Sequence, residues 1–144
     1  MMCCSQYKKS TLKANALSQT VAANGVIQMS PIKITGCSLA SDGSISITKP
    51  GLYQVIFNAT TTPSVASENI SVQLYRNNVA DPVGIAVRNP SDLTDIQSFG
   101  FSSIVEVTKS NCPCNGLASI PLTFVNTGAA ATYNNIALTV VKLA

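Results

Sequence analysis

The stretch Leu52-Tyr53-Gln54-Val55-Ile56-Phe57-Asn58-Ala59 predicts the fold class of this 144-residue chain. Four of its apolar residues, Tyr53, Val55, Phe57 and Ala59, occupy every second position. Successive side chains of an extended strand point to opposite faces, whereas a helix brings positions three or four apart onto one face. The stretch therefore predicts a β-strand that buries one of its faces.

The same alternation recurs along most of the chain. It is seen in residues 44–48, 70–74, 99–107, 118–124 and 136–140. Asparagine and glycine separate these runs, and we expect a two-residue hairpin turn at Asn77-Asn78. About eight to ten short strands with this spacing predict an all-β, antiparallel jelly-roll sandwich with little helix.

Two segments interrupt the strand pattern. They are residues 60–68 and residues 81–95, and the second contains Pro82 and Pro90. Proline lacks the backbone donor that a sheet needs, so we expect long loops at both places. Within the second loop, residues 83–87 could form a short edge strand.

The chain carries little charge. Charged residues make up 10% of the sequence and hydrophobic residues 46%, against about 25% charged residues in an ordinary soluble domain. This charge is too small to coat a whole monomer surface, so we expect another subunit or partner to cover part of it. The apolar runs, such as residues 136–141, are strand-sized and too short to cross a membrane.

Residues 1–10 form a predicted arm ahead of a domain that spans residues 11–144. Lys8, Lys9 and Lys13 precede every carboxylate of the chain, and the six acidic residues balance the other basic ones, so the net charge of +3 is assigned to the arm. This predicts either docking on an acidic surface or a solvated segment, because three lysines are too few for nucleic-acid binding. The arm lacks the apolar core of a signal peptide, so we expect the protein to be made in a cytoplasm.

Few groups in the sequence perform catalysis or bind metals. Histidine, the commonest general base and metal ligand, is absent. Asp92 and Asp95 could ligate calcium, but no glycine-centred ligand loop accompanies them. The five cysteines lack the paired spacing of a zinc site, which favours free thiols over a metal-dependent enzyme. They are Cys3, Cys4, Cys37, Cys112 and Cys114. We expect a protein that is not an enzyme and has no cofactor or metal.

Four segments carry a family resemblance. They are Lys49-Pro50-Gly51-Leu52-Tyr53-Gln54-Val55, Ile70-Ser71-Val72-Gln73-Leu74-Tyr75-Arg76-Asn77-Asn78, Ile120-Pro121-Leu122-Thr123-Phe124-Val125-Asn126 and Asn135-Ile136-Ala137-Leu138-Thr139-Val140-Val141-Lys142-Leu143. In this order they resemble the first "Pro-Gly-x-Tyr" strand, the central hairpin and the last two strands of tumour-necrosis-factor-like, complement-globular-head-like jelly rolls of bacterial and phage type. The resemblance covers about residues 20–144.

This resemblance implies a compact three-fold trimer whose interface contains the weakly charged surface. The aromatic residues expected in the core or the trimer interface are Tyr53, Phe57, Phe99, Phe101, Phe124 and Tyr133. Core packing is favoured for Phe57 and Phe124. The polar surroundings of Tyr133 favour a contact between chains.

The resemblance also implies a function, because phage head fibres and capsid decoration proteins share this layout of arm and domain. It points to a non-enzymatic homotrimer on the capsid exterior, made in the cytoplasm of a bacterial host. The arm residues expected to bind the capsid or another virion protein are Cys3, Cys4, Tyr7, Lys8 and Lys9.

The alternative function is a receptor- or glycan-binding head of a phage fibre, or a spore-surface protein. Its recognition surface would be the two predicted loops. These loops contain no aromatic residue on which a sugar could stack. Neither function involves nucleic acid or a membrane.

Overall fold

The computed structural model describes residues 11–35, 37–39, 43–47, 50–65, 68–107 and 120–144. This part of the chain forms ten β-strands and no helix. The strands are β1 (Thr11–Val21), β2 (Ser30–Thr35), β3 (Cys37–Leu39), β4 (Ile45–Ile47), β5 (Gly51–Pro63), β6 (Ile70–Arg76), β7 (Val79–Arg88), β8 (Gln97–Val107), β9 (Ile120–Asn126) and β10 (Ala131–Lys142). A helix long and apolar enough to cross a membrane is absent from the described residues.

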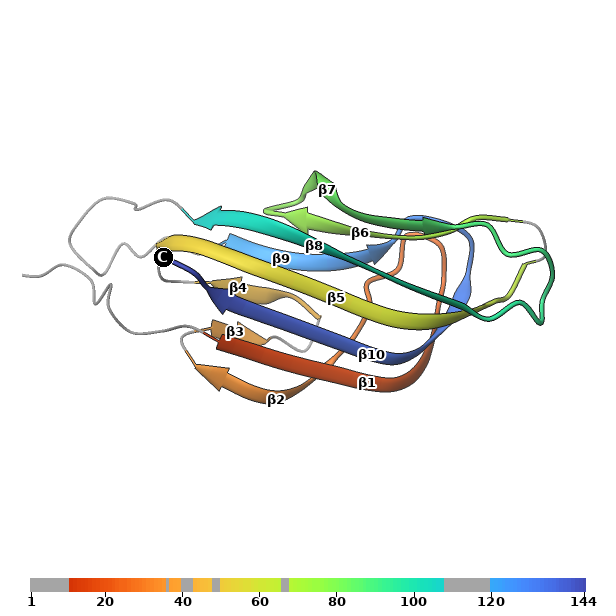
Figure 1. Cartoon of the computed structure of the whole chain (residues 1–144), viewed down its shortest axis with the longest axis horizontal. Helices are drawn as coiled ribbons and strands as arrows, with labels where there is room; N and C mark the ends of the chain where they lie inside the picture. The colour runs from red at the N-terminus through yellow and green to blue at the C-terminus, as the bar shows by residue number, and fades with distance from the viewer. Residues whose placement is uncertain (1–10, 36, 40–42, 48–49, 66–67, 108–119) are drawn as a thin grey trace, which may run out of the picture.

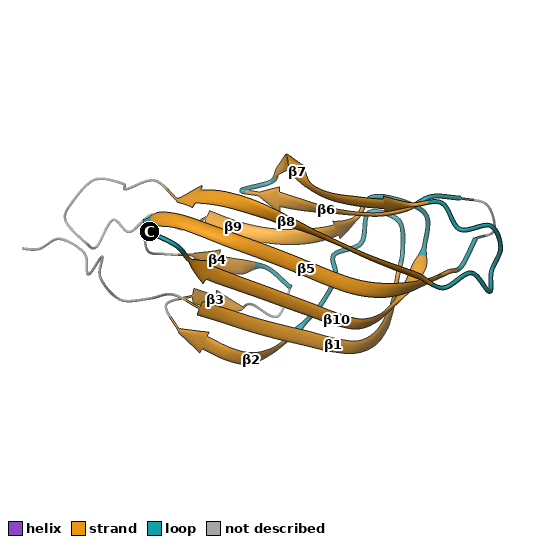
Figure 2. Ribbon diagram, viewed as in Figure 1, coloured by secondary structure: helices purple, strands orange, loops and turns teal. Residues whose placement is uncertain are grey.

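The strands form two five-stranded antiparallel sheets that pack face to face (Figures 1 and 2). Sheet A has the order β2-β1-β10-β5-β8, and sheet B has the order β3-β4-β9-β6-β7. From β4 onward the chain passes repeatedly between the two sheets, so strands that are neighbours in a sheet are often distant in sequence. The prediction of an all-β, antiparallel jelly roll is confirmed.

The inner faces of the two sheets share one apolar core. β5 lies between β10 and β8 in sheet A, and its alternating residues from Tyr53 to Pro63 are buried. The ring of Phe57 stacks on Phe101 of β8, with centroids 5.5 Å apart, and on Phe124 of β9, with centroids 5.4 Å apart. Because Phe124 belongs to sheet B, this aromatic cluster joins the two sheets.

The predicted hairpin turn at Asn77-Asn78 is confirmed. The turn joins β6 to β7, and Arg76 pairs with Val79 across it. Asn77 and Asn78 both have positive φ, at 49° and 64°. A two-residue turn with two positive φ values matches the right-handed twist of the strands, and asparagine tolerates this conformation.

The prediction of two long loops is wrong for residues 60–63 and 81–88, which belong to strands. β5 continues to Pro63, and β7 occupies Val79–Arg88. The expected edge position of residues 83–87 is confirmed, because β7 is the last strand of sheet B. Pro82 is accommodated within a strand because an edge strand has one side that needs no ladder hydrogen bond.

β1 is a strand that the alternation did not reveal. It pairs with β2 on one side and β10 on the other, near the middle of sheet A. Leu12 and Ala14 are buried, but Leu17 points outward, so the alternation breaks halfway along the strand. Lys13, counted above with the arm, lies within β1, so part of the basic charge belongs to the folded domain.

Candidate functional site

The six aromatic residues expected in the core or interface lie mainly in the core of the single protomer. Five are buried, and Phe101 is partly buried against the core. The expectation that Tyr133 contacts another chain is wrong, because its side chain has no exposed surface. Its neighbours Thr132 and Asn134 point the other way on the same strand, which gave Tyr133 its polar sequence context.

Tyr133 and Asn126 form a buried polar pair between the sheets. The Tyr133 hydroxyl donates a hydrogen bond of 2.9 Å to Oδ1 of Asn126. The amide nitrogen of Asn126 lies within hydrogen-bond distance of the carbonyl oxygens of Val21, Ala22 and Ala129. Burial raises the pKa of the Tyr133 hydroxyl, which therefore remains a hydrogen-bond donor. This pair is structural and does not reach the surface.

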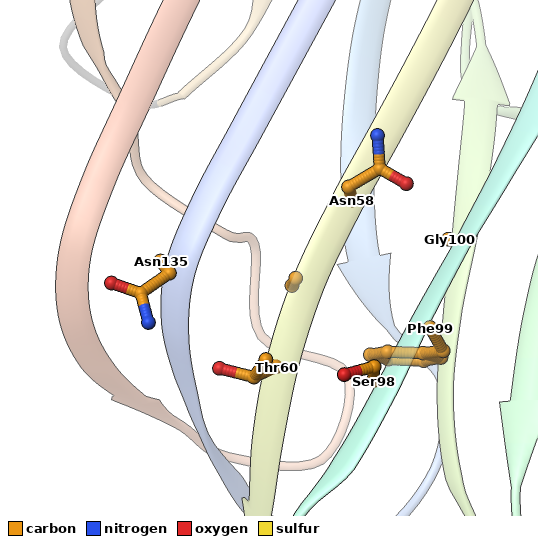
Figure 3. Close-up of a pocket in the computed structure, with 7 residues that line it drawn as sticks. Asn58, Thr60, Ser98, Phe99, Gly100 and Asn135 are labelled. Atoms are coloured by element: carbon orange, nitrogen blue, oxygen red, sulfur yellow. The ribbon is translucent and has the colours of Figure 1, made fainter.

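The outer face of sheet A carries a shallow, uncharged hollow of about 380 Å³. Asn58, Thr60, Ser98 and Asn135 line it from β5, β8 and β10 (Figure 3). Asn135 has a φ of 50° and lies where the β10–β5 register shifts, so a β-bulge turns this residue outward. Amides and hydroxyls of this kind can donate and accept hydrogen bonds, but they provide no nucleophile with a general base.

A second hollow, of about 400 Å³, adjoins the first at Asn135. Lys13, Leu17, Ile32 and Ala137 are among the residues that line it. Leu17 is 82% exposed and Ile32 is 63% exposed. This hollow thus combines exposed aliphatic side chains with a cation, in contrast to the neutral first hollow.

A third hollow lies where the edge strands β7 and β8 approach each other, and it contains a buried carboxylate. Asp81 accepts hydrogen bonds from the Ser103 hydroxyl (2.7 Å) and the Val83 backbone N–H (3.0 Å). Nε of Arg76 lies 3.9 Å from the same carboxylate. Because Asp81 is on sheet B and Ser103 is on sheet A, their hydrogen bond fastens the edges of the two sheets together.

The pKa of Asp81 reflects this environment. Burial alone would raise it, but the hydrogen bonds from Ser103 and Val83 and the Arg76 guanidinium outweigh burial and lower the pKa below its usual value. A carboxyl group whose pKa is lower in the folded state stabilises that state above the unfolded pKa, which is about 3.9. That contribution is lost as the pH falls through the folded-state pKa.

We predict that Asp81→Asn makes stability less sensitive to acid. The free energy of unfolding of the wild-type protein should fall more steeply between about pH 5 and about pH 2 than that of the variant. Denaturant titrations at several pH values measure both slopes. The matched control is Glu68→Gln, which neutralises an exposed carboxyl group outside this hollow and should leave the slope unchanged. Equal slopes for the wild type and Asp81→Asn would contradict the assigned role of Asp81.

The remaining predicted site residues divide into loop residues and residues outside the described part of the chain. Asp92 accepts two hydrogen bonds from Thr94, and Asp95 accepts two from Ser91, so both carboxylates shape their own loop. Their pKa values are lowered by these hydrogen bonds, from Thr94 and Ser91 respectively. The arm residues Cys3, Cys4, Tyr7, Lys8 and Lys9 lie outside the described residues.

Cys112 and Cys114 also lie outside the described residues, so the zinc alternative stays untested. Within the described part, three or more potential metal ligands do not come together. The described part of the chain does show two hollows on sheet A and a third at the β7–β8 edge. Sequence reasoning missed all three, because strand register and a bulge create them.

Comparisons with known proteins find likeness at the level of the fold. Neither protein-family models nor curated proteins match the sequence. Among solved structures, the Eiger TNF of S. frugiperda has a TM-score of 0.66 and 15% identity, with 94% of each chain covered. Murine APRIL at pH 5.0 has a TM-score of 0.64 and 13% identity, with 94% of this chain and all of the other covered. The PRD1 vertex protein P5 has a TM-score of 0.60 and 18% identity, with 94% of this chain and 97% of that chain covered. The expected resemblance to tumour-necrosis-factor-like jelly rolls, including one from a phage, is confirmed for the fold.

Proposed function

We propose that this protein is a structural component of a virion surface, a trimeric capsid decoration or head-fibre protein. Residues 1–10 attach it to the capsid or to another virion protein. It performs no catalysis and needs no cofactor. It resides on the capsid exterior after synthesis in the cytoplasm of a bacterial host.

The observation that carries this proposal is the likeness to the PRD1 vertex protein P5. It extends over 94% of this chain and 97% of that one, so it involves the whole jelly roll. The phage-type sequence motifs described above point in the same direction. The identity of 18% supports a shared fold, from which we propose the virion role.

Self-assembly is supported by the surface of the protomer. Sheet A exposes a broad outer face with few charges, and aliphatic side chains remain exposed on it and on the β7–β8 edge. Leu17, Ile32, Val83 and Ile104 are each more than half exposed. Aliphatic surface of this kind is favourable to cover, and a closed ring covers it without open-ended growth.

We predict that deletion of residues 1–10 abolishes capsid association and leaves self-assembly unchanged. β1 begins at Thr11, so the deletion removes no described strand. Co-sedimentation with purified particles that lack the protein measures association, and light scattering measures whether the truncated chain keeps the wild-type oligomeric mass. Three attachment points in a trimer add avidity, so losing all three arms should have a large effect. Undiminished binding of the truncated protein to particles would refute the anchoring role.

The alternative is a glycan-binding head, and the uncharged hollow of Figure 3 is the observation that favours it. Asn58, Ser98 and Asn135 present groups that can pair with sugar hydroxyls. The only aromatic ring lining the hollow, that of Phe99, is buried and offers no stacking surface. Binding on a glycan array that is lost in Asn58→Ala would establish this alternative.

A further inference from the structure

Lys13 and Lys33 lie directly opposite each other on the outer face of sheet A. They are register partners in the β1–β2 pair, and both are exposed. Like charges at directly opposite positions of a sheet destabilise it. Among the described residues, neither lysine has a carboxylate within ion-pair distance. The lysine pair therefore concentrates positive charge that the described protomer does not neutralise.

Exposed aliphatic side chains accompany these lysines. Leu17 and Ile32 line the same hollow as Lys13, and Ile32 precedes Lys33 in β2. We call Lys13, Leu17, Ile32 and Lys33 the basic patch. Aliphatic surface beside a concentrated charge suits a protein contact, because burial supplies affinity and the charge selects the partner.

The opposite edge of the same sheet has complementary properties. Ile104 and Glu106 of β8 alternate with buried residues, so both point to the outer face of sheet A. Val83 of β7 lines the third hollow together with Ile104. We call Val83, Ile104 and Glu106 the acidic edge. Arg76 also lies beside this edge, but it is next to Asp81, so this pair adds little net charge to that of Glu106.

The basic patch and the acidic edge cannot meet within one protomer. β2 and β8 are the two outer strands of sheet A, four strand spacings or roughly 19 Å apart. The register across β1, β10, β5 and β8 places Lys13 level with Ser102, two residues before Ile104 and four before Glu106. Both surfaces therefore lie toward the same end of the sheet, the end at which β1 begins (Figure 1).

We infer that the basic patch of one copy binds the acidic edge of the next copy, with Glu106 between Lys13 and Lys33. This inference rests on the self-assembly proposed above and names its contact. In a two-fold contact through either surface, like charges would face each other. A head-to-tail contact joins unlike charges, and its repetition closes into a ring when the rotation between copies is a whole fraction of a turn.

Charge reversal on either side tests the contact. Glu106→Lys should raise the dissociation constant of the oligomer at least about tenfold. The double variant Lys13→Glu/Lys33→Glu should do the same, because each variant places like charges opposite each other across the contact. The triple variant that combines them should return to within about threefold of the wild type. The matched control is Glu68→Lys, which reverses an exposed carboxylate outside the acidic edge and should change nothing. Sedimentation equilibrium of the full chain gives each constant.

Mixing the two reversed proteins in equal amounts tests the ring size. Alternating copies satisfy every contact in a ring with an even number of members. A three-membered ring must keep one like-charge contact, so the mixture should assemble less tightly than the triple variant. Equal assembly of the mixture and the triple variant would support the contact and overturn the three-fold ring.

The remaining outcomes separate this inference from the proposed function. A wild-type protein that stays monomeric at every concentration would overturn self-assembly itself. A wild-type oligomer that Glu106→Lys weakens no more than Glu68→Lys would overturn the inferred contact and leave self-assembly standing. Recovery of assembly in the triple variant requires a folded chain. Such recovery would also show that Glu106→Lys and Lys13→Glu/Lys33→Glu lose assembly through charge and not through unfolding.

Discussion

Replacing Phe57 with alanine should lower the free energy of unfolding by about 3–5 kcal/mol, the range for removing a large buried aromatic side chain. The Phe57 side chain is fully buried on β5. Its ring contacts Phe101 in its own sheet and Phe124 in the facing sheet. The substitution therefore leaves a cavity at the point where the two sheets are joined, and it also removes two aromatic contacts.

Denaturant unfolding at a fixed protein concentration measures this loss, since the stability of an oligomer depends on concentration. Ile96→Ala is the control, because Ile96 is 67% exposed and its truncation should change stability by no more than about 0.5 kcal/mol. A loss below about 1.5 kcal/mol for Phe57→Ala would show that the core collapses to fill the cavity and that the cluster does not join the sheets.

Features set by neighbouring residues could be predicted from the sequence. The alternation in β5 and the two asparagines of the β6–β7 turn depend only on residues close together in the chain. Side chains of a strand alternate between its faces, and a two-residue turn needs two residues that tolerate positive φ. Both the strand character of residues 52–59 and the hairpin at Asn77-Asn78 were therefore accessible without knowing which strands pair.

Features set by pairing between distant strands could not be predicted. Lys13 and Lys33 become neighbours only through the β1–β2 register, which includes a shift between Lys13 and Ala14. Asn135 reaches the surface hollows only because β10 contains a bulge. β1 itself was overlooked because alanine and polar residues fill much of it, and its place in the sheet depends on pairing with β10 and β2.

Tyr133 illustrates the same limit for a single residue. Its flanking residues, Thr132 and Asn134, are polar, and this context favoured a contact at the surface. The structure instead supplies Asn126 from β9, in the other sheet, as a buried hydrogen-bond partner. A polar group can be buried when such a partner is present, and the partner is invisible in the local sequence.

Asn126→Ala should be nearly as damaging as the loss of Phe57, lowering the free energy of unfolding by about 3 kcal/mol or more. Asn126 is fully buried, and its amide reaches carbonyl oxygens at the end of β1 and in the β9–β10 turn. Truncation removes a hydrogen bond from the buried Tyr133 hydroxyl and from the carbonyl oxygens of Val21 and Ala129, whereas the Ala22 carbonyl still accepts the Gly25 N–H. An unsatisfied buried polar group costs about 1–3 kcal/mol, so several together exceed the effect of one lost hydrogen bond.

Tyr133→Phe provides the matched comparison, because it removes only the hydroxyl and should cost about 1–2 kcal/mol. In the double variant the Tyr133 hydroxyl is absent, so Asn126→Ala no longer leaves it without a hydrogen-bond partner. The combined loss should therefore be smaller than the sum of the two single losses. A double-mutant cycle from denaturant unfolding measures the difference. Strict additivity would show that Tyr133 and Asn126 act independently and would contradict the buried pair.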